Sequence, residues 1–327
     1  MTVICGIESE ELNRRKSDIK LAILNNEKLD DKLNVIMVLS NPCEYKRRWF
    51  LAKQFMQHMA DTNDVELYVV ELAYGNQQYK ITDANNKKHL QLRCDIPLWH
   101  KENMFNIAVN KLLPSDWKSV AWIDADVEFE NVMWASDTLK ILNGCKDVVQ
   151  VFSHCIDMDR QESAMSIFSG FGFQYEMGVK LGSTGVNFFH PGYGFAFTRK
   201  AYDKIGGAFQ YGILGSGDHH MAQAFIGNPN SANTNASEGY KNILKEYTKK
   251  CKAIRLGYTP GVIRHYFHGS KKNRKYIERW QVLVKHQYDP YKHVEVNEDG
   301  LLVPSALCPP ELPADILNYF TERLEDD

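Results

Sequence analysis

The chain has 327 residues, 44% of them hydrophobic, which is enough to bury a full core in one large domain or one domain with a subdomain. Lys and Arg number 39 against 41 Asp and Glu, and no long basic run indicates a nucleic-acid partner. No stretch reaches the roughly 20 apolar residues of a membrane-spanning helix, and the charged N-terminus lacks the apolar centre of a signal peptide. The seven cysteines form no CxxC pair, which favours reduced thiols, so we expect a soluble, cytoplasmic protein.

The first part of the chain predicts alternating helices and strands. Residues 1–32 are charged and helix-prone, and the apolar run 33–39 that follows predicts a buried parallel strand. Apolar side chains at helical spacing over 44–60 predict a helix, and 65–70 predict a second strand, which completes one βαβ unit. A further helix is expected over 99–113. This order is typical of an α/β fold with a parallel sheet.

Two carboxylates follow the next predicted strand, Val120–Ile123. Asp124 and Asp126 stand at its carboxyl end, where open α/β sheets bind ligands. Side chains two residues apart on an extended chain project to the same side, so both carboxylates can share one site. Such a pair of oxygen ligands suits Mg²⁺ or Mn²⁺. The competing interpretation is an ordinary solvated turn.

The second part of the chain has a weaker pattern. A helix is expected over 131–142 and a strand over 148–152, whereas the Gly- and Phe-rich stretch 169–197 follows no regular period. An amphipathic segment ends near Cys251, and a short strand is expected at 261–263. The proline-containing end predicts an irregular tail closed by a short helix. The predicted organisation is an N-terminal helical extension (1–32), a catalytic domain (33–286) with halves 33–153 and 154–286, and a tail (287–327) with its helix over 314–324.

A basic segment that contains histidines follows the last predicted strand. A neutral imidazole from His265 or His268 can complete a metal shell. If the segment is extended, the two histidines face opposite ways and only one is a ligand, with His265 favoured; if it is helical, both can bind. The cations of the segment can hold a diphosphate: Lys271, Lys272 and Arg274. The alternative is a solvated basic loop with one packed histidine.

Asp218 follows two glycines, Gly215 and Gly217, which allow close approach of backbone and substrate. Its carboxylate can act as a general base for a hydroxyl group, or it can cap the apolar helix that follows, and both roles can hold at once.

Aromatic side chains framed by glycines at 190–197 can stack on a sugar ring, although such side chains are more often part of a core. The same applies to the upstream aromatic residues Phe168, Phe171, Phe173 and Tyr175.

Together these motifs resemble the GT-A glycosyltransferases over residues 33–279. WIDADV at 122–127 is similar to the Asp-x-Asp strand of that family. HPGYGFAFTRKAYDKIGG at 190–207, followed by GSGDHH, is similar to its acceptor half, and RHYFHGSKKNRKY at 264–276 to its late metal-histidine and phosphate-binding segment. The resemblance implies a GT-A type α/β fold and transfer of a sugar from a nucleoside-diphosphate donor to a hydroxyl of a carbohydrate or glycoconjugate acceptor.

The resemblance also implies roles for single residues. Asp126 would bind Mn²⁺ or Mg²⁺, Asp124 would contact the metal or the ribose of the donor, and Asp218 would be the catalytic base, with inversion favoured and a UDP-sugar as the first choice of donor. Ser216 stands where similar members carry Trp, and His219 where a second acid can stand. Residues expected near the nucleotide base or the donor are Asn41, Arg47 or Arg48, Lys101 and Asn106.

Two other functions fit the same residues. A metal-dependent nucleotide or phosphate-ester hydrolase would also use Asp pairs and histidines on an α/β sheet, and a non-catalytic carbohydrate-binding protein could use the Gly-framed aromatics. A zinc site ranks last, because the histidine pairs lack the Glu and the spacing of hydrolytic zinc motifs.

Overall fold

The apolar run after residue 32 forms the central strand of the molecule, as predicted. The structure is a computed structural model that describes residues 3–4, 7–8, 31–143, 145–178 and 189–327. Most of the predicted N-terminal helical extension lies outside the described residues, and its described part holds two short antiparallel strands, β1 (Val3–Ile4) and β2 (Ile7–Glu8).

The larger of the two main sheets has seven strands in the order β13-β8-β12-β6-β3-β4-β5. Strands β6, β3, β4 and β5 run parallel to one another, β8 and β13 are also parallel, and β12 is antiparallel to both of its neighbours. The α/β class with a largely parallel sheet is therefore confirmed. The strands are β3 (Leu33–Ser40), β4 (Val65–Tyr74), β5 (His89–Cys94), β6 (Ser119–Ile123), β8 (Val148–Gln150), β12 (Gly194–Thr198) and β13 (Leu256–Tyr258).

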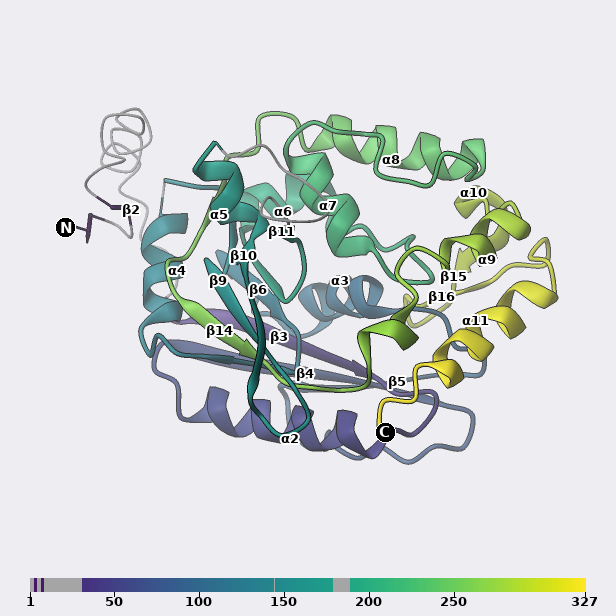
Figure 1. Cartoon of the computed structure of the whole chain (residues 1–327), viewed down its shortest axis with the longest axis horizontal. Helices are drawn as coiled ribbons and strands as arrows, with labels where there is room; N and C mark the ends of the chain where they lie inside the picture. The colour runs from purple at the N-terminus through teal and green to yellow at the C-terminus, as the bar shows by residue number, and fades with distance from the viewer. Residues whose placement is uncertain (1–2, 5–6, 9–30, 144, 179–188) are drawn as a thin grey trace.

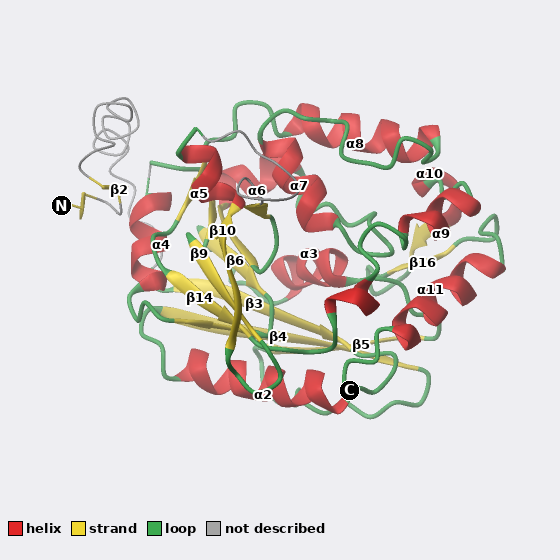
Figure 2. Ribbon diagram, in the orientation of Figure 1, coloured by secondary structure: helices red, strands yellow, loops and turns green. Residues whose placement is uncertain are grey.

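Strand β3 is apolar on both faces because helices cover both faces of the sheet. Helix α2 (Lys46–Ala60) lies below the sheet in Figure 2, and α3 (Lys101–Lys111) lies above it. Val35 and Met37 pack in the core on the α2 side, whereas Ile36 packs with the side chains of α3. Successive side chains of β3 thus pack in two different cores, as expected for a parallel sheet between two helical layers.

The second sheet joins segments that are far apart in the sequence. Its order is β11-β10-β9-β14-β7, in which β14 runs parallel to β9 and antiparallel to β7. The turn of residues 124–126 connects β6 of the first sheet directly to β7 of the second, so the two carboxylates of the Asp-x-Asp motif lie where the sheets meet. The strands are β7 (Val127–Phe129), β9 (His154–Met158), β10 (Ala164–Gly170), β11 (Phe189–His190) and β14 (Val262–His265).

The other helices pack around the two sheets (Figure 1), and α4 (Trp134–Leu142) packs on the same face of the large sheet as α2. The amphipathic segment before Cys251 is α8 (Glu238–Lys250), and the hydroxyl of its N-cap Ser237 accepts a hydrogen bond from the Tyr240 backbone N–H. The stretch without a regular period holds α5 (Phe171–Glu176), and its residues 179–188 lie outside the description. The remaining helices of this part are α6 (Arg199–Ile205), α7 (Gly217–Phe225) and α9 (Trp280–Lys285).

The helix predicted to close the tail is present, but the part of the tail before it contains short regular elements, which corrects the expectation that it is irregular. The tail contains α10 (Pro290–His293), the antiparallel strands β15 (Val294–Val296) and β16 (Leu302–Pro304), and α11 (Glu311–Glu322). Leu302, Leu312 and Ile316 are buried in the core that α3 also lines. The prolines stand mostly at the boundaries of these elements: Pro290 begins α10, Pro304 ends β16, and Pro310 precedes α11. The segment stays attached to the core because the leucines between them bury apolar surface.

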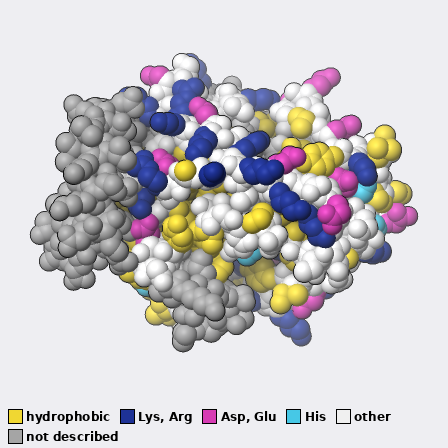
Figure 3. Space-filling model, turned by 90° about the horizontal axis from the view of Figure 1, so that it is seen from above, with side chains coloured by type: hydrophobic (Ala, Val, Ile, Leu, Met, Phe, Trp, Pro, Cys, Tyr) yellow, Lys and Arg dark blue, Asp and Glu magenta, His cyan; other side chains and the backbone are white. Residues whose placement is uncertain are grey.

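Among the described residues, no helix has the length and apolar character that crossing a membrane would require. The described cysteines are free thiols. The cytoplasmic location stays a prediction. Seen from above in Figure 3, the surface carries Lys and Arg side chains with Asp and Glu between them.

Phe105 tests the core between α3 and the large sheet. Its ring is 1% exposed and meets the edges or faces of Trp122 and Tyr202 at centroid distances of 5.7 and 6.0 Å. We expect Phe105→Ala to lower the free energy of unfolding by about 3–5 kcal/mol, because it removes a large buried side chain and leaves a cavity. The matched control Phe50→Ala, at a 49% exposed position, should cost at most about 1 kcal/mol. Denaturant unfolding of both variants measures the difference, and equal losses would contradict this assignment of the core.

Candidate metal and donor site

The Asp-x-Asp turn is held on both sides by backbone hydrogen bonds. The Asp124 N–H donates to the Tyr193 carbonyl at 2.8 Å, and the Tyr266 N–H donates to the Asp126 carbonyl at 2.8 Å. The turn is therefore fixed between the loop that precedes β12 and the end of β14. This arrangement directs the two carboxylates to different neighbours.

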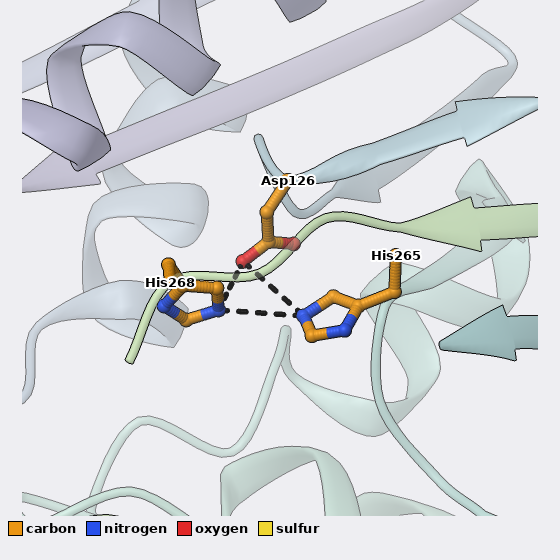
Figure 4. Close-up of side chains that lie close together, drawn as sticks. All are labelled: Asp126, His265 and His268. Carbon is orange, nitrogen blue, oxygen red and sulfur yellow. Dashed lines mark hydrogen bonds and ion pairs between the residues drawn. The ribbon is translucent and has the colours of Figure 1, made fainter. Parts of the chain in front are cut away.

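The Asp126 carboxylate meets two histidine rings (Figure 4). Its Oδ2 lies 2.8 Å from His268 Nε2 and 3.8 Å from His265 Nε2, and the two Nε2 atoms are 3.3 Å apart. One ligand atom from each residue lies within 4.8 Å of the others. Sequence analysis favoured one histidine, but the chain turns after β14 ends at His265, so both rings face the same point.

The donor set and its protonation fit a divalent metal ion. Burial lowers the pKa of His265, so its imidazole is neutral at pH 7 and can bind a metal. Burial raises the pKa of the Asp126 carboxyl, but His268 and His265 outweigh it and hold that pKa well below its ordinary value. Asp126 Oδ1 is buried and has no hydrogen-bond partner among the described residues. Two imidazoles with one carboxylate suit a transition metal such as Mn²⁺ better than Mg²⁺, which prefers oxygen ligands.

Each histidine has a carboxylate behind its other ring nitrogen. His265 Nδ1 lies 2.6 Å from Asp157 Oδ1, and His268 Nδ1 lies 3.5 Å from Glu325 Oε2. A carboxylate at this place fixes the tautomer and the orientation of a metal-binding imidazole. Sequence analysis missed both acids. Asp157 is opposite His265 in the register of β9 and β14, and such strand pairing cannot be read from a single sequence.

Asp124 lies outside the cluster of Asp126, His265 and His268, and its contact with the metal or the ribose stays a prediction. Lys101 Nζ lies 3.2 and 3.3 Å from the two oxygens of Asp124, and 3.8 Å from Asp218 Oδ2. Burial lowers the pKa of Lys101, but the two carboxylates outweigh it and raise that pKa above its ordinary value, so the ammonium is charged. Lys101 thus bridges the Asp-x-Asp turn and the first turn of α7.

Asp218 lies in the first turn of α7 and is not its N-cap, which is Ser216 in the left-handed conformation (φ 72°). The alternative interpretation of Asp218 as an N-cap is therefore wrong. Burial raises the pKa of its carboxyl, but Lys101 and His190 outweigh it, so the pKa is lower than usual and the group is ionised near pH 7. A Cβ at Gly192 would lie 2.8 Å from Asp218 Oδ2, so only glycine lets the loop before β12 approach this carboxylate so closely.

Glu102 lies beneath Asp218 and was also missed by sequence analysis. Its side chain is 3% exposed, and its Oε1 has no hydrogen-bond partner in the part of the chain that the structure describes. Burial raises the pKa of this carboxyl to about 7, although Lys101 opposes the shift. A Cβ at Gly217 would lie 2.4 Å from Glu102 Cδ, so the second glycine of the GSGDHH motif makes room for this acid.

A partly open pocket lies at the carboxyl end of β3, and Lys101 and Glu325 are among the residues that line it. Parallel strand order reverses between β3 and β6, and ligands bind at such switch points in α/β sheets. The pocket is lined by the loop after β3, by Lys101 at the start of α3, and by residues after α11. Predicted residues that line it are Asn41, Arg48 and Lys101, and residues that were not predicted include Trp99, Phe320, Arg323 and Glu325.

Other predicted donor residues have structural contacts. The amide of Asn41 exchanges hydrogen bonds with the backbone of Tyr45, which shapes the loop. Arg47 Nε donates to the Phe267 carbonyl at 2.9 Å and so supports the chain between the two histidines. Asn106 is half-buried and is not among the residues that line the pocket, because its amide exchanges hydrogen bonds with the backbone of Ala208.

The basic segment after the histidines contributes one cation close to the metal cluster. Arg274 Nη2 lies 2.8 Å from His268 Nε2. Lys271 forms an ion pair with Asp157 and lies over the ring of Phe168, and Lys272 is exposed. Arg274 is thus the best placed of the three for an anionic group held beside the cluster.

A stack of aromatic rings lies next to His265 of the cluster. His190 and Tyr193 stack at a centroid distance of 4.1 Å, and Tyr193 lies 4.7 Å from the ring of His265. Phe168 joins the stack at 5.3 Å from His190. Phe171, by contrast, is fully buried core. Phe168 therefore lies near the cluster, whereas Phe171 is a core residue, as the alternative interpretation expected.

No protein-family model and no curated protein matches the sequence. Solved structures that are similar include a mannosyltransferase from Pyrobaculum calidifontis in complex with GDP-Man and Mn²⁺ (14% identity, TM-score 0.41, covering 82% of this chain and 71% of that chain). Others are the catalytic domain of Drosophila β1,4-galactosyltransferase 7 in complex with xylobiose (9%, 0.40, 88% and 99%) and a putative nucleotide-diphospho-sugar transferase from Desulfovibrio desulfuricans G20 (10%, 0.34, 72% and 82%). These identities and TM-scores are low, and the function is argued below from the side chains.

The raised pKa of Glu102 predicts a pH dependence of stability. An acid that is harder to ionise in the folded than in the unfolded protein makes stability fall as the pH rises from its ordinary pKa of 4.5 to about 7. We expect the neutral isostere Glu102→Gln to remove this fall. The variant should gain stability relative to wild type across that window, by about 3 kcal/mol at pH 8. Denaturant unfolding of both proteins from pH 4.5 to 8 measures the gain, and a difference independent of pH would contradict it.

Proposed function

We propose that the chain is a GT-A type glycosyltransferase that depends on a divalent metal and moves a sugar from a nucleoside diphosphate to a hydroxyl of a carbohydrate or glycoconjugate. The observation that carries this proposal is the convergence of Asp126, His265 and His268 beside a pocket at the switch point of a parallel sheet. The pocket and the cluster are linked by shared neighbours, since Lys101 and Glu325 line the pocket and also contact Asp124 and His268. The sequence resemblance makes a UDP-sugar with Mn²⁺ the first choice of donor and metal.

In this proposal the three ligands Asp126, His265 and His268 hold the metal. When bound, the metal supplies positive charge that neutralises the diphosphate leaving group. Arg274 lies beside His268 and adds a second positive charge to the same region. Asp124 is held by Lys101 at the edge of the pocket, which suits a contact with the ribose of the donor better than a contact with the metal.

Asp218 is the group that removes the acceptor proton. Transfer breaks the bond between the anomeric carbon and the diphosphate oxygen, forms a bond from that carbon to the acceptor oxygen, and moves the hydroxyl proton to the base. Asp218 is ionised and lies 3.8 Å from Lys101, whose other partner is Asp124, so one side chain sets the spacing between donor and acceptor sides. Attack assisted by a base on the opposite side from the leaving group would invert the configuration.

A thermal-shift screen with wild type and Asp126→Ala tests the donor site. We expect one nucleoside diphosphate to stabilise wild type only when Mn²⁺ is present, by about 2.7 kcal/mol at 100 times its Kd. Asp126→Ala should fold normally but lose this effect, whereas the control Asp116→Ala, at an exposed position, should keep it. If no nucleotide stabilises wild type with any metal, the transferase proposal is wrong and a carbohydrate-binding protein becomes the better interpretation.

Replacement of the base separates transfer from donor binding. We expect Asp218→Asn to lower kcat by roughly 10²–10⁴-fold, because the amide cannot accept the acceptor proton. Stabilisation by nucleotide and Mn²⁺ should persist in this variant. Since Lys101 and His190 hold the pKa of Asp218 below its ordinary value, the wild-type rate should not fall until the pH is below the usual carboxyl range. Release of the sugar to water at an undiminished rate in the variant would instead indicate a hydrolase.

A further inference from the structure

The segment 319–326, called the strap below, joins two parts of the site that are far apart in sequence. It consists of the last turn of α11 and the residues that follow, and in Figure 1 the chain after α11 passes beside the start of α2. On one side it meets the loop after β3 that lines the pocket, and on the other side the chain that carries His265 and His268. Three of its residues, Phe320, Arg323 and Glu325, line the pocket itself.

The strap is bound tightly to the N-terminus of α2. The Asp326 carboxylate accepts hydrogen bonds from the backbone N–H groups of Lys46 and Arg47, at 3.0 and 2.8 Å. The helix has no side-chain cap of its own, so Asp326 supplies one from a distant part of the chain. The Tyr45 hydroxyl donates to the Phe320 carbonyl and accepts from the Leu324 N–H.

The other side of the strap packs on the chain after the histidines. The Tyr319 hydroxyl donates to the Arg274 carbonyl at 3.0 Å, and the Asn273 amide donates to the Arg323 carbonyl at 3.4 Å. A Cβ at Gly269, which has φ 89°, would lie 3.0 Å from the Glu325 Cα. Glycine thus allows the strap to lie directly against the residue that follows His268.

Glu325 is the centre of this contact and is 1% exposed. Arg48 binds its carboxylate with two nitrogens, Nε and Nη2, the second at 2.8 Å, and Arg323 Nε lies 2.6 Å from its Oε1. The oxygen that Arg48 Nε contacts, Oε2, also faces His268 Nδ1 at 3.5 Å. Burying an anion costs much free energy unless cations compensate it, and the two arginines do so. The carboxylate can then act on the histidine.

We infer that Glu325 is a positioning residue for the metal ligand His268 and that the strap is a structural part of the donor site. The inference rests on the proposed function, since it assigns a role in the same metal site. The negative charge of Glu325 favours the tautomer that carries its proton on Nδ1 of His268, and leaves the Nε2 lone pair facing Asp126. Asp157 does the same for His265, so the two ligands are held from opposite directions by one β-strand and one strap.

Mn²⁺ titrations of the full chain, followed by electron paramagnetic resonance of the free ion, test the inference without any assay of activity. We expect Glu325→Gln to weaken Mn²⁺ binding by at least about 10-fold, and Asp157→Asn to act similarly through His265. The matched control Glu322→Gln changes a strap acid that forms an exposed ion pair with Lys275, and it should bind as wild type does. A folded Glu325→Gln variant with the wild-type Kd overturns the inference.

A double-mutant cycle with His268→Ala distinguishes positioning from a general effect of the strap. If Glu325 acts through His268, Glu325→Gln should weaken Mn²⁺ binding no further in the His268→Ala background. If Glu325→Gln weakens Mn²⁺ binding in the His268→Ala background as much as it does in wild type, the inference is overturned. Should Glu325→Gln fail to fold, Glu325→Asp keeps the charge between the arginines but withdraws it from His268, and the same two outcomes apply. Absence of Mn²⁺ binding by wild type would overturn the proposed function as well, whereas wild-type binding with unaffected variants overturns the inference alone.

Discussion

The site depends on one constraint: each buried negative charge needs a positive or imidazole partner where little water is present. Asp126, Asp157, Asp218 and Glu325 lie within one small region with little access to water, and each is tolerated only because a cation or an imidazole stands beside it. The surrounding elements are arranged to bring these partners. The end of β14 and the chain just after it supply the two histidines, the start of α3 supplies Lys101, and the start of α2 supplies Arg48.

Local sequence patterns predicted the helices and strands around the site well, but they did not predict which side chains contact the site residues. The apolar run 33–39, the helical spacing over 44–60 and the carboxylates after 120–123 each report on a few neighbouring residues, and the structure has the predicted elements there. The acids behind the histidines depend instead on strand register and on the packing of residues near 325, which no local period records. For the same reason the sequence placed Asn106 near the donor, whereas its amide binds the Ala208 backbone. The sequence of a helix does not show whether a polar side chain faces a ligand or another segment of the protein.

Lys101 holds the Asp-x-Asp turn and the start of α7 in a fixed position relative to each other. It lies on the first turn of α3, directly before the buried Glu102, and reaches carboxylates from β6 and α7. A lysine in this position has a lower cost of burial because two carboxylates face it, and its charge lowers the pKa of Asp218 and opposes the rise that burial causes in the pKa of Asp124. Donor and acceptor groups on different elements can thus keep a constant spacing without a direct bond between them.

The link between Asp326 and the start of α2 has a consequence for folding. These contacts join positions 280 and 279 residues apart, so they close a very long loop and form only after the sheets bring both ends together. The βαβ units can assemble from near neighbours, but the metal ligands, their supporting acids and the pocket wall come from widely separated stretches. We therefore expect the site to be completed late in folding and, under mild stress, to open locally while the central sheet remains intact.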